Sequence, residues 1–228
     1  MNEKRDKIKE IEENGKKYTI QYLEGDKLDK NIPTKKIIIL GLSGSSKTKF
    51  SYRLLKNEFK PSSPTISLDL AGYKFKVNDK IIQIQIWDSC GNDDFCANTP
   101  NLYKNTFIAI ILYEVDNRYS FYDIEKWYNL LRQNTLGPLI YLIGNISEEE
   151  KRQINTSEGE NIKKEFNFNF FMEVSVKSGF NAEIILDRIA IDAYENSQNE
   201  KEIQNGRISL AREDLIMDNE IKRKKKFC

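Results

Sequence analysis

The stretch GLSGSSKT, at residues 41–48, combines two glycines, three serines and a lysine directly after an apolar run. It departs at one residue from the phosphate-binding pattern G-x-x-x-x-G-K-[ST], in which backbone N–H groups and a helix N-terminus surround phosphate oxygens. In that pattern Lys47 would reach the β- and γ-phosphates, and the Thr48 hydroxyl would bind Mg²⁺. Ser46 stands where the pattern has glycine. Taken alone, the stretch fits a polar turn before a helix as well as it fits a phosphate-binding loop.

Apolar runs of strand length alternate with segments of helical patterning around this loop. This alternation predicts βαβ units, and therefore a mostly parallel sheet that is covered on both faces. One connection differs, because YKFKV and IIQIQIW are joined only by NDK, which predicts an antiparallel hairpin at one edge. The apolar runs lie at residues 35–40, 81–87, 107–115, 138–144 and 171–176.

The local composition and hydrophobic pattern of the sequence divide the chain into three parts. Residues 1–34 are rich in charge, and we expect an extension there with at most one short ordered piece. Residues 35–195 predict one α/β domain, with a six-stranded, mostly parallel sheet, one antiparallel edge strand and about five flanking helices. Residues 196–228 turn polar again and end in KRKKKFC, which indicates a flexible tail.

The composition excludes several classes of protein. Lysine plus arginine number 36 and aspartate plus glutamate 35, so the net charge of +1 provides no basic field for nucleic acid. Histidine is absent, which excludes Ser-His-Asp and Cys-His catalysis and histidine metal ligands. Three cysteines are too few for a zinc set or a disulfide framework. Because no signal-peptide pattern and no apolar run of roughly 20 residues occurs, we expect a cytoplasmic protein.

Five further segments lie in a fixed order around the phosphate-loop pattern. IWDSCGNDDF, residues 86–95, resembles the W-D-T-A-G-Q-E-x-F segment of small GTPases of the Ras superfamily, especially the Rab branch. PTIS, with Thr65, is similar to the S-T-I-G of their switch I, and FIAIILYEVDNRYSF is similar to the Rab strand that ends in Y-D-V. GNISE (144–148) is similar to G-N-K-x-D, and EVSVK (173–177) to E-T-S-A-K. The resemblance covers residues 35–195 and implies the P-loop NTPase fold of a G domain.

The resemblance implies a GTP/GDP site with Mg²⁺ at its phosphate end. Thr48 and Thr65 would bind the metal directly and Asp88 would hold it through water, while the Gly91 N–H would touch the γ-phosphate and report its loss. Such contacts order loops when GTP is bound and release them after hydrolysis, which is the basis of a switch. The loop residues implied in phosphate binding are Ser43, Gly44, Ser45, Ser46, Lys47 and Thr48.

One departure from the family affects catalysis. The family has a glutamine after Gly91 that orients the attacking water, and this chain has Asn92. Asparagine keeps the amide but is shorter by about 1.5 Å, one C–C bond, and a misplacement of about 1 Å can cost on the order of a hundredfold in rate. We therefore expect slow hydrolysis by water attack on the γ-phosphate, with Asn92, Lys47 and Thr65 as the catalytic residues.

The base-recognition segments match the family less completely. Asn145 is present, but Ile146 replaces the lysine and Glu148 stands in for the aspartate. Glu148 keeps the charge and reaches one methylene further, so a bidentate pair with the guanine N1–H and N2 amino group stays open. The alternative, that ISEEEK is only an acidic helix start, stays open as well. The other base contacts implied by the resemblance are Ser175, the Val176 N–H facing guanine O6, and Lys177.

The resemblance also implies protein partners and a membrane. Effector, exchange-factor and activating proteins would bind switch regions 58–67 and 90–104. The KRKKK run before Phe227 and Cys228 resembles a polybasic, prenylated tail, although a lone terminal cysteine matches neither a C-a-a-X box nor a two-cysteine tail. The alternative is a solvated basic tail. We expect a monomer, without a nucleic-acid partner, that associates peripherally with the cytosolic face of a membrane.

Three functions follow from these observations. The first is a Rab-like small GTPase that acts as a GTP/GDP switch in vesicle and membrane traffic. The second is a pseudo-GTPase scaffold that binds partners without nucleotide turnover, because Ser46, Asn92 and Ile146 all depart from the family. The third, a P-loop nucleotide kinase, is disfavoured because no arginine-rich lid pattern occurs.

Overall fold

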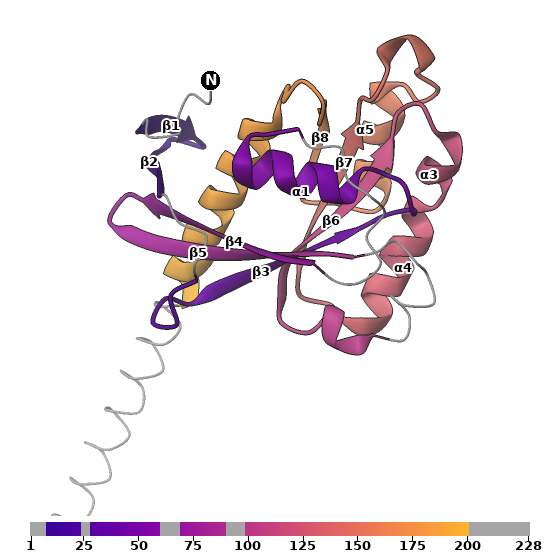
Figure 1. The fold of residues 1–228 in the computed structure, drawn as a ribbon. Coiled ribbons are helices and arrows are strands. Elements are labelled where there is room, and N and C mark those ends of the chain that lie inside the picture. The colour runs from indigo at the N-terminus through magenta and orange to yellow at the C-terminus, as the bar shows by residue number, and fades with distance from the viewer. Residues whose placement is uncertain (1–7, 24–27, 60–68, 90–98, 201–228) are drawn as a thin grey trace, which may run out of the picture. The chain divides into compact units, whose positions relative to one another are not determined.

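The computed structural model describes residues 8–23, 28–59, 69–89 and 99–200 (Figure 1). The chain forms two units, Met1–Ala190 and Ile191–Cys228. The second unit is described only for residues 191–200, which are helical. All that follows on the sheet and the site concerns the first unit.

The first unit is built on one eight-stranded sheet with the order β1-β2-β4-β5-β3-β6-β7-β8. Strands β3, β5, β6, β7 and β8 pair in parallel, whereas β1, β2, β4 and β5 pair with one another antiparallel. The strands are β1 (Lys9–Glu13), β2 (Lys16–Leu23), β3 (Thr34–Leu40), β4 (Asp69–Val77), β5 (Lys80–Asp88), β6 (Thr106–Glu114), β7 (Leu139–Asn145) and β8 (Phe170–Val174).

Helices connect the parallel strands, as the alternating pattern predicts. The described helices are α1 (Lys47–Lys56), α3 (Arg118–Tyr122), α4 (Ile124–Asn134), α5 (Thr156–Glu165) and residues 182–190, with short 3-10 helices η1 (Pro100–Leu102) and η2 (Glu149–Lys151). The predicted α/β fold, with its mostly parallel sheet, is confirmed. So is the predicted antiparallel pairing of β4 with β5 across the turn at Asn78.

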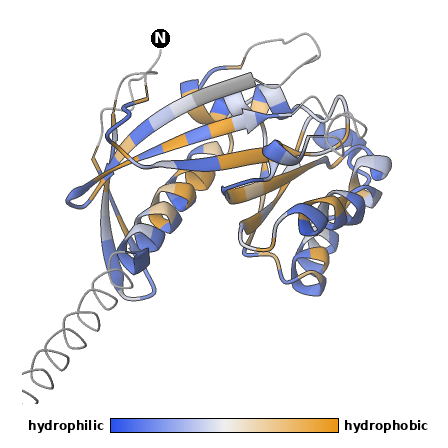
Figure 2. Ribbon diagram, turned by 90° about the horizontal axis from the view of Figure 1, so that it is seen from below, coloured by the Kyte–Doolittle hydropathy of each residue, from blue (hydrophilic) through white to orange (hydrophobic). Residues whose placement is uncertain are grey.

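The core lies on both faces of the central strands. Ile38 and Leu40 of β3 are fully buried and belong to a cluster that includes Trp127 of α4. Successive strand residues point to opposite faces, so Ile37 and Ile39, also fully buried, contribute to the other face. This two-sided burial explains why the run KKIIIL is continuously apolar rather than alternating. Figure 2 shows hydrophobic residues concentrated along these strands.

Helix ends fall at residues that suit them. Helix α1 ends at Asn57, which has a left-handed φ of 54° and whose N–H donates to the Arg53 carbonyl. Helix α3 begins at Asn117, whose side chain accepts from the backbone N–H groups of Tyr119 and Ser120. These caps fix where the loops of the site begin and end.

The N-terminal segment corrects one expectation, because it contributes two strands rather than at most one short ordered piece. Asn14 and Gly15 form the turn with φ of 52° and 75°, values that these two residue types tolerate. Tyr18, Ile20 and Tyr22 alternate along β2 and are all buried. Strand β2 pairs antiparallel with β4, so the six predicted strands are present and the hairpin extends the sheet by two.

The hairpin is also fixed by ion pairs to residues 182–190. Lys9 lies 2.7 Å from Glu183 and 3.1 Å from Asp187. The Tyr22 hydroxyl donates to Asp187, and Arg188 pairs with Glu13. Charges in the first strand therefore bond to a helix more than 170 residues further along the chain.

Candidate functional site

The loop between β3 and α1 lies at the carboxyl end of the parallel strands, where ligands bind in sheets of this type. Gly41 has φ +147°, and a Cβ on it would lie 2.4 Å from the Leu112 carbonyl oxygen. Gly44 has φ +84° and open space around it. The first glycine is therefore required by close packing against β6, and the second by its backbone angle.

Lys47 is the first residue of α1 and is only 5% exposed. Its Nζ donates to the carbonyl oxygens of Gly41 and Leu42, both at 2.9 Å. Ser45 supports the same turn, because its hydroxyl donates to the Leu42 carbonyl at 2.7 Å. The loop thus curls around the ammonium group, which places a positive charge at the N-terminus of α1.

Thr48 and Asp88 are brought together because β3 and β5 are neighbours in the sheet. The Thr48 hydroxyl donates to Oδ2 of Asp88 at 2.5 Å, and Asp88 is 2% exposed. Within the described ranges no group of three or more acidic or cysteine side chains could hold a metal ion. Mg²⁺ is commonly bound by one or two protein oxygens together with phosphate oxygens, so this pair fits the metal of a nucleotide site.

Ser46 takes the backbone conformation that glycine would supply. Its φ of 51° and ψ of 18° are left-handed, and its side chain makes no capping hydrogen bond to the helix. For a residue with a Cβ this conformation costs roughly 1–2 kcal/mol. The loop therefore closes in spite of the missing glycine, at a local cost in strain.

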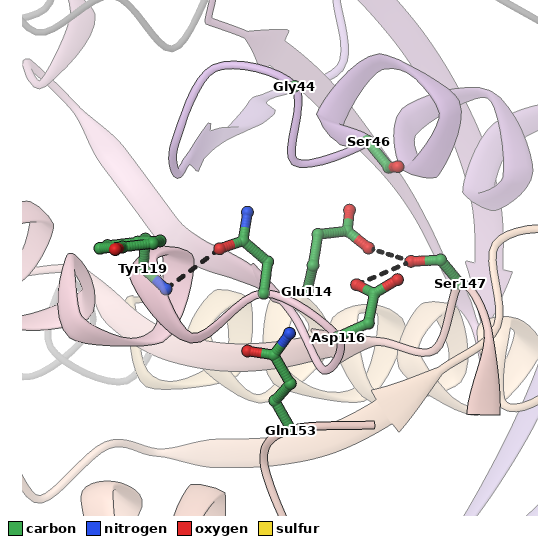
Figure 3. Close-up of a pocket in the computed structure, with 8 residues that line it drawn as sticks. Gly44, Ser46, Glu114, Asp116, Tyr119, Ser147 and Gln153 are labelled. Atoms are coloured by element: carbon green, nitrogen blue, oxygen red, sulfur yellow. Dashed lines mark hydrogen bonds between the residues drawn. The ribbon is translucent and has the colours of Figure 1, made fainter. Parts of the chain in front are cut away.

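A pocket of about 490 Å³ opens between this loop and the ends of β6 and β7 (Figure 3). Two of its residues, Gly44 and Ser46, belong to the predicted phosphate loop. The others were not predicted, although Asp116 and Asn117, which follow a buried strand in YEVDN, were a signal that could have found these two residues. The lining residues are Gly44, Ser46, Glu114, Asp116, Asn117, Tyr119, Ser147 and Gln153.

Glu114 is the buried charge of this pocket, with 6% exposure. Its Oε2 accepts from Asn145 Nδ2 at 2.7 Å and from Ser147 Oγ at 2.6 Å (Figure 3 shows the latter). Burial raises the pKa of Glu114, and the nearby charge of Asp116 acts in the same direction. Hydrogen bonds from Ser147, Ser46 and Asn145 oppose the rise without cancelling it.

Asn145, at the end of β7, uses both ends of its amide inside the protein. Its Nδ2 donates to Glu114, and its Oδ1 accepts from the backbone N–H of Val176 at 3.0 Å. The Val176 N–H was predicted to face guanine O6, and in the structure it donates to Asn145. This amide therefore joins β6, β7 and the segment that follows β8.

Glu148 lies at the start of η2 with its side chain about half exposed. It forms an ion pair with Lys151 at 2.8 Å, and this neighbour lowers its pKa, with a further contribution from Lys177. Ile146 packs against the buried cluster of the α4 face. The hydroxyl of Ser175 accepts from the Ser178 N–H at 3.2 Å. Thus the side chain predicted to bind the base is paired with a neighbouring lysine.

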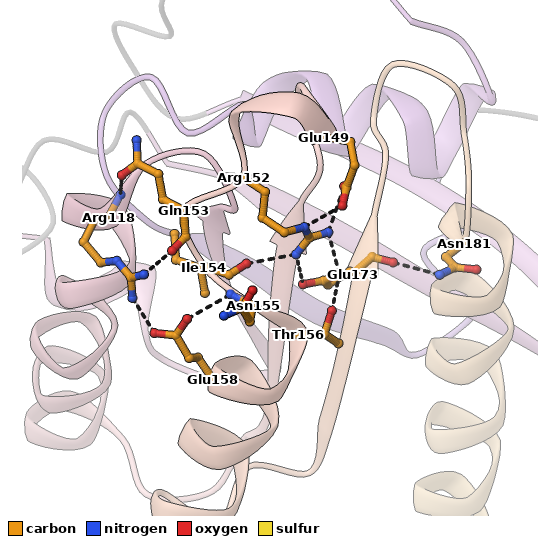
Figure 4. Close-up of polar contacts among 10 residues, drawn as sticks. All are labelled: Arg118, Glu149, Arg152, Gln153, Ile154, Asn155, Thr156, Glu158, Glu173 and Asn181. Carbon is orange, nitrogen blue, oxygen red and sulfur yellow. Dashed lines mark hydrogen bonds and ion pairs between the residues drawn. The ribbon is translucent and has the colours of Figure 1, made fainter.

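Polar contacts hold the segment between β7 and α5 in place (Figure 4). Arg152 donates to Glu149 at 2.6 Å and to Glu173 at 2.8 Å, and both carboxylates raise its pKa. Arg118 donates to the Glu158 carboxylate and to the Gln153 carbonyl. These bonds tie the segment after Glu148 to β8, the strand that leads into Ser175–Lys177.

Several predicted residues lie outside the described part of the chain. They include Thr65, Gly91 and Asn92, most of switch regions 58–67 and 90–104, and Cys228. Their roles remain predictions. No helix among the described residues is long and apolar enough to cross a membrane.

The fold and the phosphate loop together define a nucleotide-binding domain of the P-loop type, and comparison with known proteins agrees. A model of the Ras family matches residues 36–195, and the chain belongs to that family. Ras-related protein Rab-11B of Dictyostelium discoideum is 31% identical over 157 residues, which cover 68% of this chain and 71% of that protein. The protein is therefore a Rab-like small GTPase of the Ras superfamily, a class that in general binds guanine nucleotide and Mg²⁺.

Proposed function

We propose that this protein is a GTP/GDP-binding switch in intracellular vesicle and membrane traffic, with slow GTP hydrolysis. The observation that carries the proposal is the phosphate end of the site, where Lys47 lies inside the loop and Thr48 bonds to Asp88. An ammonium group at a helix N-terminus beside two oxygen ligands suits a nucleoside phosphate with its metal ion.

The mechanism assigns one task to each group at this end. The backbone N–H groups of residues 43–48 and the Lys47 ammonium would bind the phosphates, and Thr48, Thr65 and Asp88 would hold a Mg²⁺ ion, which would neutralise charge on the phosphate oxygens. Asn92 orients the attacking water with a side chain one methylene shorter than glutamine, so hydrolysis is slow and is completed by an activating protein. Gly91 senses the γ-phosphate and couples its loss to the switch regions.

At the base end, Asn145, Glu148, Ser175, Val176 and Lys177 hold guanine. To bind the base, the Glu148 carboxylate must leave its present partner, the exposed Lys151. An exposed ion pair of this kind is worth about 0.2–1 kcal/mol. The free-energy cost of breaking this ion pair is therefore small compared with the gain from a bidentate bond to a base.

Partners and location follow from the same proposal. Effectors, exchange factors and activating proteins bind switch regions 58–67 and 90–104 of a monomer. The basic tail, with prenylation at Cys228, holds the protein on the cytosolic face of a membrane, where each basic residue contributes about 1 kcal/mol. The relative's name supports the Rab branch, and the trafficking role is inferred from it.

A second function, a pseudo-GTPase scaffold, is favoured by one feature of the base end. Asn145 and the Val176 N–H bond to each other, and Glu148 bonds to Lys151. When the groups that would recognise the base already form hydrogen bonds and ion pairs with one another, binding of a base gains less free energy. In this function the protein binds partners and does not turn over nucleotide.

The decisive experiment measures Mg²⁺-dependent binding of a fluorescent GTP analogue, competed in turn by GTP, GDP and ATP. We expect displacement by GTP and GDP only, followed by slow phosphate release that Asn92→Gln accelerates. Asn129→Gln, a substitution of the same type at an exposed position of α4 outside the proposed machinery, serves as the matched control. Binding absent at tens of micromolar, an affinity weaker than about 6 kcal/mol, would establish the scaffold function instead.

A further inference from the structure

Arg53 lies in the last turn of α1 and is 7% exposed, although no phosphate or metal role falls to it. Its Nε donates to the Val176 carbonyl and its Nη2 to the Lys177 carbonyl, each at 2.8 Å. Its Nη1 donates to the Asn57 carbonyl, also at 2.8 Å. One guanidinium group therefore joins the end of α1 to two consecutive peptide groups of the base segment.

These bonds determine which way the base segment faces. A peptide group is planar and trans, so its N–H points opposite to its C=O. Because Arg53 draws the carbonyls of Val176 and Lys177 toward α1, the next N–H groups along the chain, those of Lys177 and Ser178, point away from it, and the Ser178 N–H donates to the Ser175 hydroxyl. The peptide group that follows Val176 is thereby fixed beside the Val176 N–H, the group expected to face guanine O6. The planar fork of arginine fixes two acceptors at once, which a lysine ammonium does less specifically.

The close approach of the guanidinium group also depends on Gly179. This glycine has φ +87°, and a Cβ on it would lie 3.3 Å from Arg53 Nη1. Its N–H donates to the Ser175 carbonyl at 2.7 Å, which closes the turn around residues 175–179. The turn thus places a residue without a side chain where the arginine packs.

We infer that Arg53 is a positioning residue for base recognition, which sets the orientation of the Val176–Lys177 backbone and thereby the preference for guanine over adenine. The inference rests on the proposed function. Helix α1 begins with Lys47 and Thr48 at the phosphate end and holds the base segment from its last turn. The two ends of the nucleotide site are therefore connected through one helix.

The test compares Arg53→Lys and Arg53→Gln with the wild-type protein in two measurements. Competition binding gives the affinities for GDP and ADP, and amide hydrogen exchange without nucleotide reports on residues 175–179. Arg132→Lys is the matched control, because Arg132 also donates to a backbone carbonyl near a helix end, that of Leu136. Leu136 lies before the start of β7, whereas the site lies at the carboxyl ends of the strands. Melting temperature is recorded for every variant.

We expect Arg53→Lys and Arg53→Gln to bind GDP about tenfold or more weakly than the wild type does. We expect a smaller loss of ADP affinity, so that the preference for GDP over ADP decreases. The amide hydrogens of residues 177–179 should exchange faster than in the wild type. Equal losses for GDP and ADP would overturn the inference, since Arg53 would then serve the whole fold or the phosphate end. Unchanged affinities would overturn it as well. If the wild-type protein binds neither nucleotide, the proposed function fails. In that case, unchanged amide exchange in the Arg53 variants would refute the positioning role, and faster exchange would support only the contact between Arg53 and residues 175–179.

Discussion

At the phosphate end of the site, Lys47 is held by main-chain carbonyls, whereas at the base end Asn145 and Glu148 each donate to or pair with another side chain. Lys47 bonds to two backbone carbonyls, and the loop around it keeps its shape although Ser46 replaces a glycine. Asn145, by contrast, depends on the Glu114 carboxylate, and Glu148 on Lys151.

This difference explains why substitutions have unequal consequences at the two ends. Backbone N–H groups are present whatever the side chain, so a phosphate loop absorbs a change of residue for the cost of some strain. Base selectivity needs a particular acceptor opposite a particular donor, and a wrong length leaves polar groups unpaired. The departures from the family at Ile146 and Glu148 therefore matter more than the one at Ser46.

The largest effect is expected from removing the Lys47 side chain at the phosphate end. Lys47→Ala deletes the ammonium group that the loop surrounds and should weaken GDP binding by at least about a hundredfold, or about 2.7 kcal/mol. Equilibrium binding measures it, with Lys56→Ala, an exposed lysine of the same helix, as the control. Retained affinity in the Lys47 variant would mean that the main chain alone binds the phosphates.

An intermediate effect is expected from restoring the family's residues at the base end. Ile146→Lys combined with Glu148→Asp should raise GDP affinity about tenfold, or about 1.4 kcal/mol, and leave ADP affinity unchanged. Glu150→Asp, at an exposed position of the same segment, provides a neighbouring control. An equal gain for both nucleotides would show that the change acts outside base recognition and would remove the contrast between the two ends.

The smallest effect concerns pH and the buried Glu114. Burial raises its pKa in the folded protein above the unfolded value, so its contribution to stability is present at low pH and is lost as the pH rises through the folded pKa. The free energy of unfolding of the wild type relative to Glu114→Gln should therefore fall as the pH rises above about 4, the ordinary range of a glutamate carboxyl. We expect a change on the order of 1 kcal/mol.

Urea unfolding at a series of pH values measures this difference. Glu125→Gln, at an exposed position of α4, is the control. A difference that grows with pH would mean that hydrogen bonds to the Glu114 carboxylate outweigh its burial.

The conformation of the loop around Lys47 could be predicted from the sequence because its geometry is local. The glycines, Lys47 and Thr48 lie within eight residues, and the Asp88 contact follows from the pairing of β3 with β5. Glu114 could not be found in this way, because its role arises from the register of β6 against β7, which sets it opposite Asn145. A pattern in one strand does not reveal which residue of the next strand lies beside it.

The N-terminal hairpin was missed for a different reason. Its turn carries Asn14-Gly15 between alternating residues, which is the strongest short-range hairpin signal. The many lysines and glutamates around it gave the segment the composition of a tail. The charges of β1 lie on an edge strand, where they discourage pairing with other chains, and two of these residues, Lys9 and Glu13, bond to the helix at 183–188.

The bonds between this hairpin and residues 183–188 join segments that are synthesised at very different times. Lys9 and Asp187 are separated by 178 residues, so the first strands leave the ribosome long before their last partners exist. At about 5–20 residues per second this delay is on the order of ten seconds. Strand β4, the neighbour of β2 in the sheet, is synthesised well before residues 183–188, so the hairpin's partner in the sheet is available before its partner in the helix.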